Sequence, residues 1–436
     1  MARREEYQSE PRSIRESGKA FRQARREERR EIKRARKAAS YFDYNLMIGI
    51  FFLLAYGLII LYSASSYIGQ VENGDDMFYF KSQAVFVAVG LVACFLVSRF
   101  DYHFFGKCSV LIFIVSLVSM ALVRTSLGVE TFGARRWLQL PGGHTFQPSE
   151  LAKFAVILFI SLLFSKLGEN ASFGRSVPIL FLGIILAVFV YYFTDNLSTA
   201  IIVLGILFSM YFIVSRSTVP FILLLMIGLA FVVFAHRALY VYVETLTVDD
   251  LAKMPFRIRR ILVWVAPQLF PDDGGMQVTQ GLYAVGAGGF FGKGLGNSAQ
   301  KLGHIPEIQN DMIFAVVCEE LGIFGVILML ALFTFIIYRM VVIARNAPDL
   351  YGALIVTGVI AHISLQVILN LSVVLNLIPT TGISLPFFSY GGTSMLFTLA
   401  EIGLVLIVSK RIRLKGREED FTEEVIREED FTIEYL

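Results

Sequence analysis

The sequence predicts an all-α integral membrane protein with about ten transmembrane helices and a large extracytoplasmic loop between the seventh and eighth helices. Of its 436 residues, 56% are hydrophobic and only 17% are charged, whereas soluble domains carry roughly 25% charged residues. Apolar runs of about 18 residues or more recur along the whole chain, and each is long enough to span a bilayer. This repetition excludes a single globular domain with one membrane anchor.

Ten apolar runs are expected to cross the membrane. The first starts behind a long charged tail, and this position together with its length distinguishes it from a cleaved signal peptide. The fifth and sixth runs are short and meet at Asp195 and Asn196, so a re-entrant pair is an alternative for them. The expected spans are residues 44–66, 83–99, 108–125, 149–166, 178–194, 198–215, 219–237, 311–338, 352–375 and 392–409.

The charge of the flanking segments orients these spans. Residues 1–42 hold 14 Lys and Arg against seven Asp and Glu, and a basic segment beside the first span predicts a cytoplasmic N-terminus. Ten spans then return the C-terminus to the cytoplasm. We expect a basic cytoplasmic tail at 1–42, a membrane domain at 43–410 and an acidic cytoplasmic tail at 411–436. The acidic tail repeats the hexapeptide Arg-Glu-Glu-Asp-Phe-Thr, which is typical of a solvated tail or, alternatively, of a docking peptide.

One connection, residues 238–310, is far longer than the usual ~4–6 residues and lies outside the cell in this topology. It holds aromatic, glycine and basic clusters rather than a low-complexity sequence, so we expect it to be ordered and functional. Within it, residues 255–265 combine arginines with apolar residues and a tryptophan. This pattern fits an interfacial helix on the outer leaflet or a packed surface helix.

Ionisable residues at the mouth of a span are costly in a membrane, which makes each one a functional candidate. The first group contains Arg136, Trp137 and the start of the fourth span, where Pro148 suits the first helical turn. Glu150 and Lys153 are i,i+3 neighbours and share one helix face. They form either a mutually neutralising pair or the polar wall of a cavity.

The second group is the segment 286–296, which contains six glycines. A P-loop needs Ser or Thr after its lysine, but Lys293 is followed by Gly294, so nucleotide binding is not expected. The segment is typical either of tight turns or of backbone amides that approach a phosphate together with Lys293.

The third group surrounds Asp311 at the entrance of the eighth span. Asp311 suits either a helix N-cap or a functional carboxylate. At ~100° per residue, Glu319 lies about 80° from Asp311 and can share its cavity, whereas Glu320 faces the other way and should make a separate contact. The Pro- and Gly-rich segment 377–392, which holds Ser389, predicts irregular backbone that protein or a water-filled cavity must cover.

These motifs together resemble the FtsW/RodA family (the shape, elongation, division and sporulation proteins), and they are closer to the division and sporulation branch. The likeness runs from about residue 43 to residue 412. One departure is Asp195-Asn-Leu-Ser-Thr199, where relatives often have Pro-Asp-Leu-Gly-Thr. Because the carboxylate is displaced by one residue, we assign Asp195 no catalytic role. The matching stretches are 136–137, 146–153, 286–301, 305–322 and 379–392.

The resemblance implies a peptidoglycan glycosyltransferase of the bacterial plasma membrane that polymerises Lipid II into glycan strands on the outer face, for cell division or sporulation. It implies that Asp311 is essential. It also implies a class B penicillin-binding protein as a transpeptidase partner, contacts with other divisome proteins and no nucleic-acid partner.

Joining two sugars with loss of a lipid pyrophosphate requires a base for the attacking 4-hydroxyl and positive charge at the leaving group. We expect Asp311 to be the base, and the candidate cations are Arg136, Lys153, Lys293 and Arg260. A divalent cation such as Mg²⁺ or Mn²⁺ could assist, although the sequence has no dedicated ligand cluster. The expected substrate-binding residues are Arg136, Glu150, Lys153, Lys293, Glu307, Glu319 and Ser389.

The main alternative is a Lipid II flippase or another polytopic membrane transporter, because many spans with buried charges also suit a carrier. A carrier should place its essential charges near the bilayer midplane and show two similar halves. Here the candidates crowd toward one face, and no repeat of spans is evident. A scaffolding role among division proteins is compatible with either activity.

Overall fold

The computed structural model describes residues 42–412 except 132–133, 140–144, 169–171, 216, 244, 247–253, 255, 272–273 and 304. The expectations for both charged tails and for the repeated hexapeptide lie outside the described residues. Residues Asp43–Val408 form one compact unit, which contains every candidate site residue.

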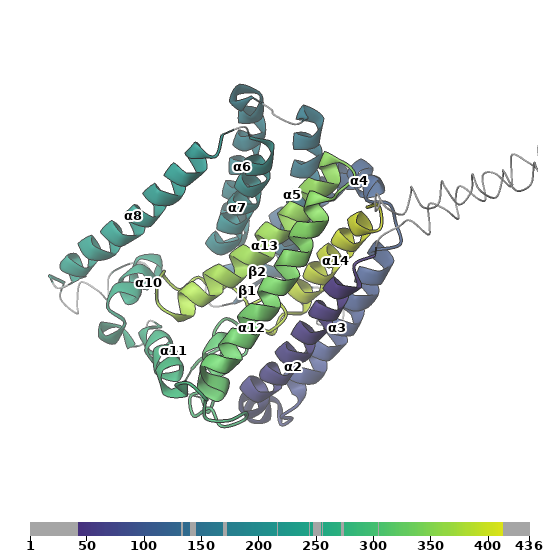
Figure 1. Ribbon diagram of the computed structural model, residues 1–436. Coiled ribbons are helices and arrows are strands. Elements are labelled where there is room, and N and C mark those ends of the chain that lie inside the picture. The colour runs from purple at the N-terminus through teal and green to yellow at the C-terminus, as the bar shows by residue number, and fades with distance from the viewer. Residues whose placement is uncertain are drawn as a thin grey trace, which may run out of the picture. The chain divides into compact units, whose positions relative to one another are not determined.

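Ten long helices in the described part of the chain lie where the sequence predicts its ten spans (Figure 1). Nine of them are long and apolar enough to cross a membrane. The other, α5, carries Glu150 and Lys153 near its start. The chain is therefore a polytopic membrane protein. The ten are α2 (Tyr44–Asn73), α3 (Phe78–Val97), α4 (Tyr102–Leu122), α5 (Pro148–Leu167), α6 (Phe173–Thr194), α7 (Leu197–Val214), α8 (Val219–Val243), α12 (Ile313–Arg345), α13 (Leu350–Val374) and α14 (Gly392–Ser409).

Local signals in the sequence set several helix ends. Pro148 occupies the first turn of α5, as predicted. Asp43 caps α2 by accepting from the Leu46 N–H at 2.9 Å. Helices α3 and α4 start before the apolar runs at 83–99 and 108–125, because helical hydrogen bonding continues past the residues that hydropathy detects.

Helices α6 and α7 are two separate helices joined by a tight junction. Asp195 ends α6 in the left-handed conformation, with φ 48°. Asn196 begins α7 by accepting from the Thr199 N–H at 3.0 Å. Both helices meet the length and hydropathy expected of a span.

The prediction of an entirely helical protein missed a small antiparallel sheet between α4 and α5. Its strands are β1 (Gly128–Thr131), β2 (Ala134–Gln139) and β3 (Thr145–Phe146), in the order β1-β2-β3. Val129 pairs with Trp137, and Leu138 pairs with Phe146. The hairpin brings Arg136 from β2 back toward the helical bundle.

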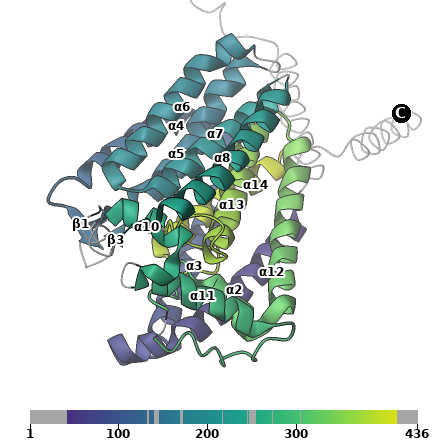
Figure 2. The ribbon, with the colours of Figure 1, turned by 90° about the vertical axis from the view of Figure 1, so that its left-hand side faces the viewer.

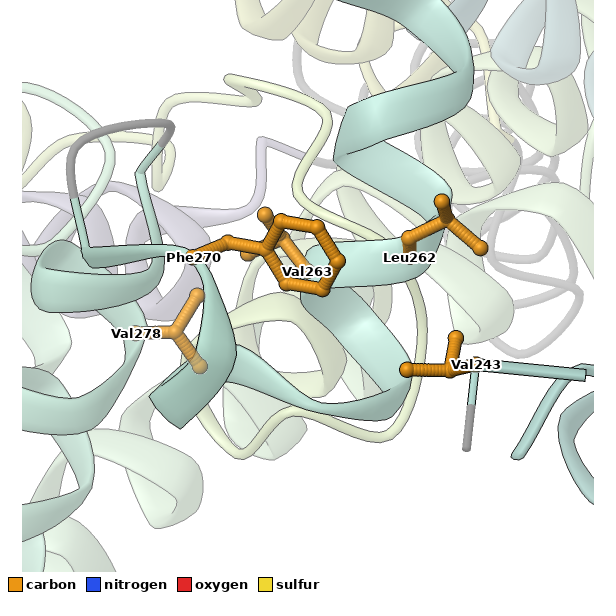
Figure 3. Close-up of a cluster of buried hydrophobic side chains, with 5 residues drawn as sticks. All are labelled: Val243, Leu262, Val263, Phe270 and Val278. Atoms are coloured by element: carbon orange, nitrogen blue, oxygen red, sulfur yellow. The ribbon is translucent and has the colours of Figure 1, made fainter. Parts of the chain in front are cut away.

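The long connection between the seventh and eighth helices is ordered where it is described. It begins after Val243, later than hydropathy indicates, and contains α10 (Phe256–Val265), the 3-10 turn η1 (Pro267–Leu269) and α11 (Gly275–Gly288). In Figure 1, α10 lies beside the lower end of α8 and α11 lies below it, near the lower end of α12, and Figure 2 also shows α11 below α10. Figure 3 shows the apolar cluster that joins them to α8. Its members are Val243, Leu262, Val263, Phe270 and Val278.

This cluster decides between the two expectations for residues 255–265. Leu262 and Val263 are 1% exposed, and Trp264 is 4% exposed. The Trp264 Nε1 donates to the Asn376 carbonyl at 3.2 Å, and the Asn376 side chain donates back to the Trp264 carbonyl at 3.1 Å. Leu262, Val263 and Trp264 are therefore packed against protein, which favours the packed-helix alternative, while Ile258 and Ile261 remain exposed.

The centre of the bundle is formed by α13, which packs against α5, α7 and α12. By contrast, α8 runs at an angle to α6 and α7 in Figure 1. Val243, at the end of α8, is that helix's buried residue. An apolar helix that is exposed along its length is compatible with a lipid environment.

Candidate active site

Asp311 lies directly before α12 at the end of the bundle that carries α10 and α11. The N-cap of α12 is Met312, and it makes no side-chain capping bond, so Asp311 is not the helix cap. Asn370 on α13 fixes the Asp311 backbone, because its Nδ2 donates to the carbonyl of Asp311 at 2.8 Å. Gln277 on α11 holds the carboxylate, because its Nε2 donates to Asp311 Oδ1 at 3.3 Å.

Two arginines face this carboxylate from different elements. Arg136 on β2 and Arg260 on α10 both interact electrostatically with Asp311 and favour its charged form. Burial nevertheless dominates, and it raises the pKa of Asp311 from 3.8 to about 6. Burial and the neighbouring Arg260 charge lower the pKa of Arg136. The site is therefore a half-buried carboxylate whose charge two guanidinium groups only partly compensate.

The junction of α6 and α7 positions Arg136. Arg136 Nη2 donates to the backbone carbonyl of Asp195 at 3.4 Å. The Asp195 carboxylate forms an ion pair with Arg124 at 3.2 Å. Asp195 thus has a positioning role, consistent with the absence of a catalytic assignment from the sequence.

Glu307 stands in a strained turn beside the site. Its φ is 53°, a conformation that costs a non-glycine residue about 1–3 kcal/mol. Its carboxylate accepts from the Asn310 side-chain amide. Burial, followed by the nearby charge of Glu72, raises the pKa of Glu307. Glu307 in turn raises the pKa of Asp311, so this expected site residue is an electrostatic neighbour of the predicted base.

Lys293 and Glu319 belong to a second charged cluster. They form an ion pair at 2.6 Å, and Glu319 also accepts from the Ser298 hydroxyl. Glu320 pairs with Lys301 at 2.9 Å and accepts from the Ser63 hydroxyl at 2.7 Å. The structure therefore does not group Glu319 with Asp311. The helical angle counted from Asp311 was wrong because α12 begins only at Ile313.

Two backbone amides of the glycine-rich segment 286–296 donate hydrogen bonds to α12. Helix α12 is broken at Gly322, whose φ is 62°, and the break frees the carbonyls of Glu319 and Glu320. These carbonyls accept from the N–H groups of Lys293 and Gly294, each at 2.9 Å. Both amides are therefore occupied, and the segment acts as a structural clip in which the N–H groups of Lys293 and Gly294 do not face a phosphate.

The other expected substrate-binding residues have protein partners. Glu150 and Lys153 form a buried ion pair at 2.9 Å, although Glu150 Oε2 has no partner in the described part of the chain. The Ser389 hydroxyl accepts from the Leu385 N–H at 2.7 Å, so Ser389 closes a turn. Of the residues predicted to bind substrate, Arg136 and Glu307 are the ones that the structure places around Asp311.

Sequence reasoning missed Gln277 and Asn370, and it left Arg260 as a secondary candidate. Neither Gln277 nor Asn370 is charged, and Asn370 lies inside an apolar helix. An amide within a membrane span is the one signal that could have indicated it. Gln277 acquires its role only through the fold of the long connection.

The residues around Asp311 do not form a metal site on their own. No group of three or more His, Cys, Asp and Glu that could hold a metal ion occurs among the described residues. The nearest charged partners of Asp311 are two arginines and Glu307. A divalent cation at this place would need most of its ligands from a phosphorylated substrate.

The helical bundle and its charged end define a multi-pass membrane protein with a polar site at one end of its spans. A family model described as "Cell cycle protein", which bears the names FtsW, RodA and SpoVE, matches residues 44–414. The chain belongs to the FtsW/RodA/SpoVE family.

Relatives and solved structures agree with this membership over most of their length. The chain is 37% identical to stage V sporulation protein E of Bacillus subtilis (strain 168), covering 85% of this chain and 98% of that protein. It is 32% identical to the probable peptidoglycan glycosyltransferase FtsW of Geobacter sp. (strain M18), covering 87% and 99%.

Two solved structures share the fold. One comes from a study titled "Structural coordination of polymerization and crosslinking by a peptidoglycan synthase complex", with TM-score 0.65, 26% identity and coverage of 86% of this chain and 98% of that chain. The other is the rod shape determining protein RodA of Thermus thermophilus, with TM-score 0.57, 26% identity and coverage of 84% and 96%.

Proposed function

We propose that the protein is a peptidoglycan glycosyltransferase that polymerises Lipid II into glycan strands on the outer face of the plasma membrane, in cell division or sporulation. Relatives named for this activity support the proposal. The observation that carries it is the carboxylate of Asp311, which has a pKa of about 6 and faces two arginines at one end of a membrane bundle.

In this reaction Asp311 is the general base. Its carboxylate takes the proton of the attacking sugar 4-hydroxyl while the oxygen forms a bond to the anomeric carbon of the donor. The bond from that carbon to the lipid pyrophosphate breaks, and its electron pair leaves with the pyrophosphate. One displacement inverts an α-linked donor to a β-linked product, so one base and no covalent intermediate are sufficient. A base with a pKa near the working pH is well matched to this task.

The leaving pyrophosphate needs positive charge. Lys153 and Lys293 are each paired with a glutamate at 2.9 Å and 2.6 Å, so we do not assign them to it. Arg260 and Arg136 lie beside the base and are the two candidates for this charge, because an arginine can donate two parallel hydrogen bonds to phosphate oxygens. An Mg²⁺ or Mn²⁺ ion bound mainly through the phosphates would add further charge there.

We further propose that a class B penicillin-binding protein is the partner that cross-links the strands. This proposal includes cytoplasmic N- and C-termini and an outward-facing Asp311, because the basic N-terminal segment favours that orientation. The polyprenyl tail of Lipid II would remain in the lipid beside the spans.

The decisive experiment measures glycan-strand synthesis and Lipid II binding on the purified protein with its transpeptidase, comparing wild type with Asp311→Asn. We expect synthesis to fall by at least ~10²–10⁴-fold, the usual contribution of a general base. Binding should change little, because Asn keeps the shape of the site. Normal synthesis by the variant would remove Asp311 as the base. A wild type that makes no glycan even with its partner would instead favour a flippase.

A further inference from the structure

A small space beside Gly382 separates Asp311 from Arg136. Gly382 is exposed and lies in the loop between α13 and α14, with φ 67°. A Cβ atom at this position would lie 3.8 Å from Arg136 Nη1 and 3.8 Å from Asp311 Oδ2, the two described atoms within 4 Å of it. The absent side chain thus leaves room between a guanidinium group and a carboxylate oxygen.

The polar groups around this space are incompletely satisfied. Arg136 Nε and Thr381 Oγ1 are buried and have no hydrogen-bond partner in the described part of the chain. Buried polar atoms in folded proteins are nearly always paired. Arg136 borders the space through Nη1 and Thr381 directly precedes Gly382, so both residues keep unused hydrogen-bonding capacity near it. Gln277 engages Oδ1 of Asp311, while Oδ2 is the oxygen that borders the space.

We propose that this space is the seat of the attacking sugar hydroxyl, an inference that rests on the proposed glycosyltransferase function. A hydroxyl group can donate its proton to Asp311 Oδ2 and at the same time accept from Arg136 Nη1. A pyrophosphate oxygen has no proton to donate, and its charge would repel the carboxylate. The hydroxyl seat therefore assigns Arg136 to the attacking oxygen and leaves Arg260 for the pyrophosphate.

The chemistry at the hydroxyl seat is balanced. The O–H proton passes to Asp311 Oδ2 as the hydroxyl oxygen bonds to the anomeric carbon, and the pyrophosphate leaves with the electron pair of the broken bond. Arg136 stabilises the negative charge that develops on the attacking oxygen. Gln277 fixes the carboxylate so that Oδ2 keeps facing the seat.

The test is Gly382→Ala, with Gly74→Ala as the matched control. Gly74 has φ 69°, but nothing lies within 4 Å of a Cβ atom there, so both variants carry the same backbone strain and only one fills the hydroxyl seat. We expect Gly382→Ala to slow strand synthesis by about 100-fold, the usual effect of misplacing a reacting group. Gly74→Ala should stay close to wild type. Equal rates for the two variants would overturn the inference.

A second pair of variants, Arg136→Lys and Arg135→Lys, tests the inference if Gly382→Ala lowers the thermal midpoint more than Gly74→Ala does. Arg136→Lys keeps the charge but withdraws Nη1, whereas Arg135, which pairs with Glu130 at 3.3 Å, tolerates the same change. We expect at least a tenfold slower rate for Arg136→Lys, with Arg135→Lys close to wild type and unchanged Lipid II binding for both. Equal rates would contradict the hydroxyl seat. If the wild-type protein synthesised no glycan strands, that result would instead contradict the proposed function.

Discussion

At the start of α12, Asp311 combines features that seldom occur together in one carboxylate. It is half-buried, held by Gln277 at Oδ1 and faced by Arg136 and Arg260, yet its pKa is about 6. The folded protein therefore binds the Asp311 proton more tightly than the unfolded chain does. Stability from this group is present at low pH and is lost as pH rises from about 4 to about 6. Its ionised form at neutral pH is a destabilising feature, and it is the form that the proposed general base needs.

The raised pKa of Asp311 predicts one effect on activity and one on stability. Wild-type kcat/KM should fall about tenfold per pH unit below pH 6 and level off above it, because only the ionised carboxylate accepts a proton. Asp311→Asn should melt a few degrees higher than wild type at pH 7.5, since it carries no enclosed charge. The difference should vanish near pH 4. Thermal midpoints across this pH range check the prediction, and a variant less stable than wild type at pH 7.5 would contradict it.

At the scale of elements, the glycine-rich clip has a structural purpose that its composition does not reveal. A Cβ at Gly292 would collide with the backbone carbonyl of Glu320, and a Cβ at Gly322 would collide with the Gly292 backbone. Both residues also have positive φ. Glycine at these two positions therefore lets the clip reach the break in α12. The short helical segment before the break is thereby held next to Asp311.

The buried pair Lys301–Glu320 should make this attachment sensitive to the loss of either partner alone. Glu320 is fully buried, and the Lys301 side chain is only 7% exposed. Removing one partner of a buried pair typically costs about 3–5 kcal/mol, so Glu320→Ala should lower the thermal midpoint markedly. Glu130→Ala is the control, because its exposed pair with Arg135 is worth about 1 kcal/mol at most.

A double variant separates the ion pair from other contacts of Glu320. Lys301→Met with Glu320→Gln leaves no lone charge, so its midpoint should recover much of the loss seen in Glu320→Ala. If the double variant were as unstable as Glu320→Ala, the loss of stability would come from other contacts of Glu320 and not from the unpaired charge of Lys301.

At the scale of the whole molecule, the polytopic architecture fixes which segments share a membrane face. The long connection with α10 and α11 joins the same end of the bundle as the β-hairpin, the α6–α7 junction and the segment 377–392, because residues of all four surround Asp311. In the proposed orientation this end faces outward. The turn between α12 and α13 then faces the cytoplasm.

This orientation predicts a labelling pattern. Asn297, directly after the clip, and Asn346, after α12, are both exposed. A membrane-impermeant maleimide added to intact spheroplasts should label Asn297→Cys and leave Asn346→Cys unlabelled until the membrane is permeabilised. The native Cys94 and Cys318 are buried, but Cys108 is half-buried, so both variants are made in a Cys108→Ser background. The reverse pattern would place Asp311 on the cytoplasmic side and would contradict the proposed function.

The sequence by itself determined the ten-helix membrane architecture and the family, and it singled out Asp311 and Arg136 as candidate site residues. Spans are set by hydropathy and length, which a linear sequence displays directly. A carboxylate or guanidinium group at the mouth of a span stands out because burying charge is costly.

Only the tertiary structure decided which polar groups meet. Glu319 pairs with Lys293, and amides of the glycine-rich segment donate to carbonyls of the broken helix α12. Gln277 and Gly382 acquired their places beside Asp311 through folding of the long connection and the segment 377–392. Distances between residues far apart in the chain depend on how irregular backbone packs, which no local period or charge pattern encodes. The hydroxyl seat is consequently a property of the fold, although each of its residues is visible in the sequence.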